Sequence, residues 1–249
     1  GVSNLIRVTA GAVFTNTAWG SNAGLINGIW NTLQVDDGGK MFFEGGGFLF
    51  GQGNSRSNAI IVGGVGAQSY LKMGGIQSPQ NGGGDYGSGI RVTNAVFEIT
   101  GGLLLGRSFT TNDYLQVLSN GVVNLNNTSL QIADNGVGFG NYVTIDSGIL
   151  SNVTTITIGG AAGANSNSIY VVNGGQLLNR AGLTVGNAAG AQSNAVFIGG
   201  AGNSSTVSNT TTTVGAAGAG FNQIVVTNAT WLTSGAATIG SGSSNNTVA

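Results

Sequence analysis

The residues best suited to chemistry in this chain are its acidic side chains, because the sequence contains no histidine and no cysteine. The absence of histidine removes the usual catalytic base and the commonest metal ligand, and the absence of cysteine excludes thiolate chemistry. Two carboxyl groups hydrolyse a glycosidic bond only when they lie roughly 5–10 Å apart. Enzymatic activity would therefore require the fold to bring carboxylates together. The acidic residues are Asp36, Asp37, Glu44, Asp85, Glu98, Asp113, Asp134 and Asp146.

Two glycine-rich strings look like ligand-binding loops, and neither is supported by the residues around it. Residues 82–87 (GGGDYG) match one unit of a calcium-binding nonapeptide repeat, but no second copy follows one repeat later. Gly136, Gly138 and Gly140 lack the lysine and the following helix of a phosphate-binding loop. We interpret both strings as turns, and we predict neither a metal nor a cofactor.

A repeat of about 27 residues runs through the whole chain and decides how these side chains are positioned. Each unit begins at a polar anchor residue, and aliphatic residues stand two and four positions after it. A fixed period of this length indicates a solenoid, and the alternation indicates strands. We expect residues 1–249 to form one continuous repeat array. The anchors are Asn4, Asn31, Asn58, Ser88, Asp113, Asn141, Asn167, Asn194, Asn222 and Asn246.

The unit that begins at Asn167 shows the internal pattern most clearly. Strands are expected at 169–171, 176–178 and 183–185, with a corner at 173–175 where Asn and Gly tolerate positive φ. The pattern predicts an all-β fold, a right-handed parallel β-helix of about nine coils with three short strands each. Coils spaced by about 4.8 Å would form a rod about 43 Å long.

Two features of the repeat are less regular or admit another fold. The third strand has no clear counterpart in the first and third coils, and Pro79 predicts a loop where the third coil should carry it. A β-sandwich would also place strands every 8–12 residues, but its strands need not repeat in sequence. The repetition therefore favours the β-helix.

The composition excludes several classes of function. Hydrophobic residues make up 41% of the chain and recur periodically, which favours an ordered fold over disorder. A net charge of −1 argues against binding to nucleic acid. No apolar run approaches the roughly 18 residues of a membrane helix, so no membrane span is expected in this chain.

The repeats from about residue 141 onward resemble those of autotransporter passenger regions and autotransporter-associated β-strand repeat proteins of Gram-negative bacteria. The residues that carry the resemblance are 171–177 (VVNGGQL), 183–191 (LTVGNAAGA) and 230–231 (TW). The resemblance implies a right-handed β-helix that is secreted and displayed outside the cell or on the bacterial surface. It carries little information about activity.

Two polar columns are expected to run along the rod. The anchors should stack as an amide ladder that stiffens the fold, although each asparagine could also act simply as a turn former. A second, outward column consists of threonines, which resemble an ice-binding array but form a single row and are also ordinary exposed strand residues. The clearest ladder positions are Asn141, Asn167, Asn194 and Asn222. The threonine column consists of Thr157, Thr184, Thr213 and Thr238.

An outward apolar stripe is expected at Tyr170, Phe197 and Val225, each three residues after its anchor. It lies in a part of the chain with few charges, since Arg180 is the last charged residue. Exposed apolar patches commonly mark interfaces. We interpret the stripe as a candidate contact surface between rods, and cover by the chain's own loops is the alternative.

The repeat also weighs against catalysis. Asp36 and Asp146 share a column, but four coils separate them, which corresponds to about 19 Å. That distance is too long for joint chemistry. We interpret Asp36 and Asp37 as solvated turn residues that lead into Gly38 and Gly39.

These observations predict a non-catalytic structural protein, a rigid stalk, fibre or filament with a role in adhesion or the extracellular matrix. Its expected partners are further copies, end to end or side by side, and surface glycans or host or matrix ligands. The chain starts and stops inside coils, which predicts either a longer protein or stacking of copies. The alternative is a polysaccharide-binding or polysaccharide-degrading β-helix, with Trp19 or Trp30 lining a groove.

Overall fold

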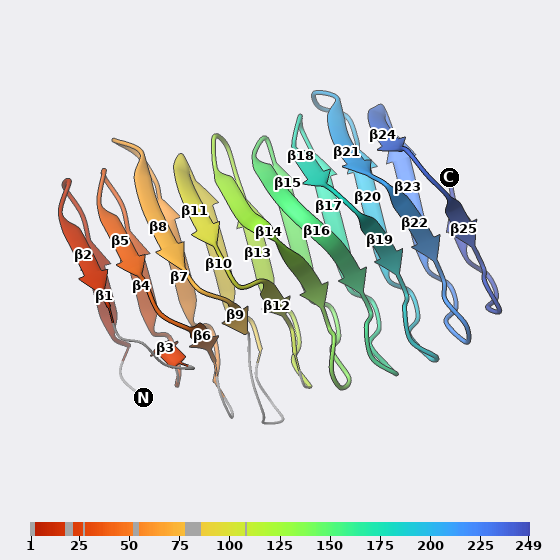
Figure 1. Cartoon of the computed structure of the whole chain (residues 1–249), viewed down its shortest axis with the longest axis horizontal. Helices are drawn as coiled ribbons and strands as arrows, with labels where there is room; N and C mark the ends of the chain where they lie inside the picture. The colour runs from red at the N-terminus through yellow and green to blue at the C-terminus, as the bar shows by residue number, and fades with distance from the viewer. Residues whose placement is uncertain (1–2, 18–21, 27, 52–54, 78–85, 108) are drawn as a thin grey trace.

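The computed structural model describes residues 3–17, 22–26, 28–51, 55–77, 86–107 and 109–249. The chain forms an elongated parallel β-helix whose coils follow one another along a single axis (Figure 1). The nearer strands point down the picture, the fainter strands lie behind them, and the chain advances from left to right. This path is right-handed, so the predicted fold class is confirmed.

One wall of the rod is a ten-stranded parallel sheet to which each coil contributes its first strand. Its register follows the anchors, since residues two after successive anchors are partners, as in Ile90 and Leu115. The strands in order are β1 (Leu5–Val8), β4 (Thr32–Val35), β7 (Ala59–Gly63), β10 (Gly89–Thr93), β13 (Tyr114–Val117), β15 (Tyr142–Asp146), β17 (Ser168–Val172), β20 (Ala195–Gly199), β23 (Gln223–Thr227) and β26 (Thr247–Val248).

The rest of the wall is a sixteen-stranded sheet that contains two rows of strands. Two long strands, β14 (Val122–Ile132) and β16 (Ile149–Ile158), run through both rows. The other strands of the second row are β2 (Val13–Asn16), β5 (Lys40–Phe43), β8 (Ser69–Met73), β11 (Ala95–Ile99), β18 (Gln176–Asn179), β21 (Ser205–Asn209) and β24 (Ala229–Thr233). The other strands of the third row are β3 (Asn22–Ile26), β6 (Gly47–Phe50), β9 (Ile76–Gln77), β12 (Leu103–Leu105), β19 (Gly182–Val185), β22 (Thr211–Val214) and β25 (Ala237–Ile239).

The third row continues through the two coils in which the sequence shows no clear match. In the first coil β3 pairs with β6, and in the third coil β9 pairs with both β6 and β12. The third coil therefore has its strand at Ile76–Gln77, before Pro79. Pro79 itself, and the loop predicted there, lie outside the described residues.

The core consists of inward side chains that stack on their equivalents in neighbouring coils. Ile60, Ile90, Leu115 and Val143 form one such column, and none of them is exposed to solvent. Full burial of each of these side chains contributes about 1.5–3 kcal/mol. Since each coil covers the next, the stability of the core depends on contacts between coils.

Candidate functional site

The corner that precedes each anchor has the same backbone conformation throughout the rod. The residue immediately before the anchor adopts a left-handed conformation in nine successive coils, with φ between 52° and 67°. Because the corner is the same in each coil, it presents each anchor side chain in the same orientation. These corner residues are Trp30, Ser57, Gly87, Asn112, Gly140, Ser166, Ser193, Phe221 and Asn245.

The anchor side chains form a hydrogen-bonded column along the axis. Asn141 donates from its backbone N–H and from Nδ2 to Oδ1 of Asn167, both at 3.0 Å. Asn167 donates in the same way to Asn194, and Asn194 to Asn222 at 3.0 and 3.1 Å. The column passes through Ser88 and Asp113, whose side-chain oxygens accept from the preceding anchors' backbone N–H groups.

The amides also bind the loops, so the ladder and the turn interpretations describe the same side chains. Nδ2 of Asn194 donates to the carbonyl of Ala164 at 2.9 Å, and Nδ2 of Asn222 donates to that of Ala191 at 3.1 Å. Both asparagines are fully buried. Their donors and acceptors are used within the protein, which makes the column a structural element without capacity for a ligand.

The structure places Tyr170, Phe197 and Val225 side by side on the outer face of the first sheet, as expected. The rings of Tyr170 and Phe197 stack with centroids 5.1 Å apart and planes 9° apart. Tyr170 is 38% exposed, and the other two side chains are half-buried. Because the two rings cover each other's facing surfaces, the stripe presents mainly ring edges to a partner.

A second aromatic pair lies on the same face, in the two preceding coils. Tyr114 and Tyr142 stack with centroids 5.7 Å apart. The Tyr114 ring lies over Gly89, where a Cβ atom would come within 2.2 Å of the ring. Burial raises the pKa of Tyr142, with Tyr114 adding to the effect. Both tyrosines are half-buried, so this pair covers the sheet more than it projects from it.

The threonine column is continuous in the structure. Thr157, Thr184, Thr213 and Thr238 are successive partners in the third row of strands. The neighbouring outward position in the coil of Thr184 is Gly182, which pairs with Thr211. The array is therefore one threonine wide at this point, as the sequence indicates.

The carboxylates are dispersed, and Asp36 does not behave as predicted. Asp36 is 8% exposed and accepts from Arg7 Nη2 at 2.7 Å and from Gln34 Nε2 at 2.6 Å. The interpretation of Asp36 as a solvated turn residue is wrong, because the Arg7 guanidinium reaches it from the preceding coil. The Arg7 hydrogen bond holds the pKa of the Asp36 carboxyl below its ordinary value. Asp37 is the exposed turn residue, with φ 47°.

Asp146 lies far from Asp36 along the rod. The strands β7, β10 and β13 separate their strands, β4 and β15, in the first sheet. Asp146 accepts instead from Asn173 Nδ2 at 3.0 Å and from Ser147 Oγ at 3.1 Å. Across the part of the chain that the structure describes, no three Asp or Glu residues group in a way that could hold a metal. Residues 82–85 of the calcium-like string lie outside that part.

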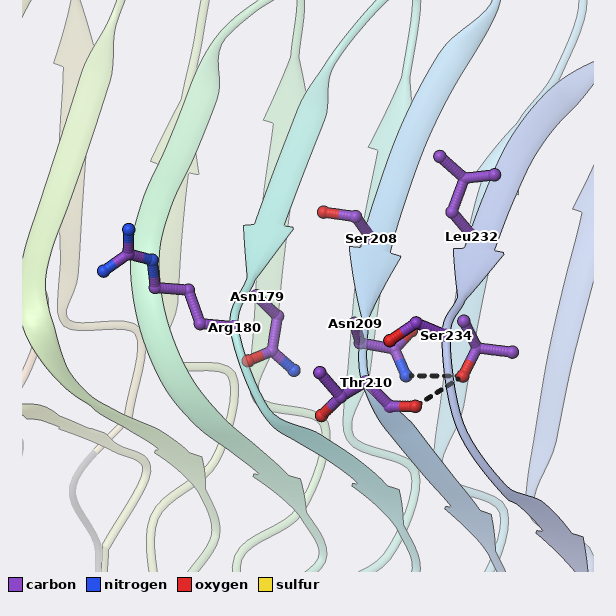
Figure 2. A pocket seen from close by; sticks show the side chains of 8 residues that line it. Asn179, Arg180, Ser208, Asn209, Thr210, Leu232 and Ser234 are labelled. Carbon is purple, nitrogen blue, oxygen red and sulfur yellow. Dashed lines mark hydrogen bonds between the residues drawn. The ribbon is translucent and has the colours of Figure 1, made fainter.

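A shallow groove of about 580 Å³ crosses the ends of β18, β21 and β24 (Figure 2). Its two asparagine side chains and its arginine are already hydrogen-bonded within the protein. Asn179 Nδ2 donates to the carbonyl of Gly182 at 2.9 Å, and Asn209 Nδ2 donates to that of Thr211 at 2.8 Å. Arg180 points away from the other labelled side chains and donates to Asn127 Oδ1 at 2.7 Å. The groove is a by-product of two asparagine turns. It is lined by Asn179, Arg180, Ser208, Asn209, Thr210, Leu232, Thr233 and Ser234.

A second hollow, of about 420 Å³, lies on the outer face of the second row near the start of the rod. Lys40, Tyr70 and Val96 are successive partners across β5, β8 and β11. The ring of Phe42 packs against that of Tyr70 with centroids 5.4 Å apart. We refer to this site as the Lys40 hollow. It is lined by Lys40, Phe42, Gln68, Ser69, Tyr70 and Val96.

Counting from the anchors does not reveal the Lys40 hollow. Lys40 lies nine residues after Asn31, whereas its partner Tyr70 lies twelve residues after Asn58. The difference is the longer first corner of the third coil. The weak signal available in the sequence is that both strands carry an aromatic and a lysine, at 40–43 (KMFF) and 69–73 (SYLKM).

The two tryptophans proposed for a binding groove do not identify one. Trp30 is 60% exposed on the corner before Asn31. Trp19 lies outside the described residues. Within those residues, no helix is long and apolar enough to cross a bilayer.

Comparison of the chain with protein-family models, with curated proteins and with solved structures finds no match.

Proposed function

We propose that this chain is a non-catalytic, rigid β-solenoid that serves as a stalk, fibre or filament element in adhesion or in an extracellular matrix. The observation that carries the proposal is the uninterrupted anchor ladder from Asn4 to Asn246. A rod whose coils are joined by backbone pairing, a continuous core and buried amides is suited to bearing load along its axis.

Location outside the cell is part of the same proposal. It is supported by the resemblance of the repeats from about residue 141 onward to autotransporter-type surface proteins. The absence of cysteine is compatible with an oxidising environment, since no thiol is present to react there. Surface glycans and host or matrix molecules are the partners that such a location would offer.

Self-association, end to end or side by side, belongs to the proposal as well. The Tyr170–Phe197 stack supports lateral contact, because it is a partly exposed apolar surface on the outer face of the first sheet. Ile6 in the first coil and Val248 in the last occupy the same column and are 60% and 37% exposed. A second copy stacked end to end would cover both positions.

Electron microscopy of the purified chain, combined with small-angle scattering, tests the proposal. We expect uniform rods or filaments with a width that does not change along their length. Incubation with a panel of polysaccharides should release no unsaturated or reducing ends. A compact particle, or cleavage of any polysaccharide that is lost in an Asp36→Asn variant, would contradict the proposed function.

A further inference from the structure

The Lys40 hollow has the composition of a small ligand site. Ligand sites typically combine apolar and aromatic walls with a few polar groups in a concave volume of some 300–1,000 Å³. Here Phe42, Tyr70 and Val96 supply the apolar wall, while Gln68 and Lys40 supply an amide and an ammonium group. Gln68 and Lys40 are exposed, so both polar groups can reach a molecule that enters from solvent.

Lys40 is the one charged residue in this lining, and its charge is not neutralised by a neighbour. Within the described residues Lys40 forms no ion pair, whereas Lys72 on the next coil lies 3.6 Å from Glu44. Burial raises the pKa of Tyr70, and the hydrogen bond of its hydroxyl to Glu98 adds to the effect. Glu44 is paired with Lys72 and Glu98 is hydrogen-bonded to Tyr70, so the Lys40 ammonium remains available to an anion.

We propose that the Lys40 hollow binds an acidic sugar unit of a polysaccharide, with the sugar's carboxylate at Lys40. The C–H groups of the sugar ring would pack on Phe42 and Tyr70, and its hydroxyls would exchange hydrogen bonds with Gln68. The proposal goes beyond the structural role, because a rigid rod needs no ligand.

Other ligand classes fit the hollow less well. The strands β5, β8 and β11 are each paired on both sides, so no free strand edge can accept an extended peptide. Nucleic acids bind through several phosphate contacts, and only one cation is available here. No carboxylate lines the hollow, which removes the hard oxygen ligands that a Ca²⁺ or Mg²⁺ ion requires.

Isothermal titration calorimetry with two tetrasaccharides, one of galacturonic acid and one of galactose, tests the proposal. We expect the acidic sugar to bind at least ten-fold more tightly than the neutral one at low salt, with a difference that shrinks as salt rises. Lys40→Gln should remove this difference and leave only the weak affinity for the neutral sugar. Tyr70→Leu should weaken the binding of both sugars, because both pack on the ring.

Lys72→Gln is the matched control, since it removes the same charge from the next coil at a position already held by Glu44. It should retain most of the preference for the acidic sugar, and unfolding curves of all three variants verify that each is folded. Three outcomes would overturn the proposal. They are no binding of the acidic sugar to the unmodified chain, unchanged binding in Lys40→Gln, and an equal loss in Lys72→Gln. None of them bears on whether the chain forms rods.

Discussion

Oδ1 of Asn194 accepts two hydrogen bonds from Asn167, one from its backbone N–H and one from its side-chain Nδ2, both at 3.0 Å. The same side chain donates onward to Asn222 at 3.1 Å and to the Ala164 carbonyl at 2.9 Å. One buried amide thus joins three coils and a loop. This arrangement makes the anchor column directional, since each asparagine donates toward the C-terminal end of the rod.

Replacement of Asn194 by alanine should therefore be severely destabilising. It removes the acceptor of the Asn167 backbone N–H and of one Nδ2 N–H, and the donor to the Ala164 carbonyl. Each buried group left without a partner costs about 1–3 kcal/mol. We expect a loss of about 3–5 kcal/mol in the free energy of unfolding, measured by urea titration.

Asn187→Ala is the control for that substitution, because Asn187 is exposed on the loop that leads to Asn194. Surface changes of this kind usually stay within about 0.5 kcal/mol. Similar losses for Asn187→Ala and Asn194→Ala would show that the buried amide contributes no more than an exposed one.

The glycine that ends the third strand makes room for the anchor amide. A Cβ atom at Gly186 would lie 2.2 Å from Nδ2 of Asn222, and the backbone there has φ +74°. Gly190 has a nearly identical φ of +77°, but the nearest atom to its Cβ would be 3.8 Å away. Gly186→Ala should cost at least about 2 kcal/mol more than Gly190→Ala, because only the first adds a clash to the backbone strain.

Thermal and urea unfolding of the two glycine variants provide this comparison. The left-handed backbone conformation alone costs an alanine about 1–2 kcal/mol, and this cost should be the same in both variants. If Gly190→Ala were as destabilising as Gly186→Ala, the left-handed backbone would account for the whole effect and the amide contact for none of it.

The ion pair between Arg7 and Asp36 should make part of the stability dependent on acid. Because the pKa of Asp36 is lowered in the folded state, its contribution is present above the unfolded pKa near 3.8. This stabilisation is lost as the pH falls through the pKa of Asp36 in the folded state. Burial raises the pKa of Asp134, so ionisation of Asp134 lowers the stability of the fold as the pH rises. The measurement must therefore distinguish the effect of Asp36 from that of Asp134.

The difference in unfolding free energy between the unmodified chain and Asp36→Asn isolates this contribution. Measured between pH 7 and pH 2, the difference should be largest at neutral pH and shrink below about pH 4. A difference that stayed constant over this range would mean that the charge on Asp36 does not stabilise the fold.

The stacked rings on the first sheet should matter more for contacts between rods than for the fold. Replacement of both Tyr170 and Phe197 by serine removes an aromatic pair, whose stacking contributes about 0.5–1.5 kcal/mol. If this surface joins rods side by side, sedimentation velocity should show a several-fold drop in association. Thr157→Ser and Thr184→Ser, on the third row, should leave association unchanged. A drop confined to the threonine variants would place the lateral contact on the other face.

Prediction from sequence succeeds for the first sheet for a simple physical reason. The anchor precedes its strand directly, with no loop of variable length between them. The partners Arg91 and Gln116 can therefore be identified by counting from Ser88 and Asp113. The amide column could be anticipated in the same way, because its members are the anchors themselves.

Counting fails in the second row because the first corner changes in length. The corner between the first two strands spans residues 36–39 in the second coil and 64–68 in the third, and this difference brings Lys40 beside Tyr70. The burial of Asp36 cannot be predicted from sequence for a related reason. Its partner Arg7 belongs to another coil, and the sequence shows only that Asp36 precedes a turn.

The sequence by itself therefore determined the parallel β-helix, its three strands per coil and the alignment of the anchor asparagines in one column. These features depend on alternation and period, which are local properties that each repeat restates. Only the tertiary structure decided which outward side chains meet, including Arg7 with Asp36 and Lys40 with Tyr70. Those contacts depend on the length of the corners and on side chains that extend from one coil to the next, and no single repeat encodes either.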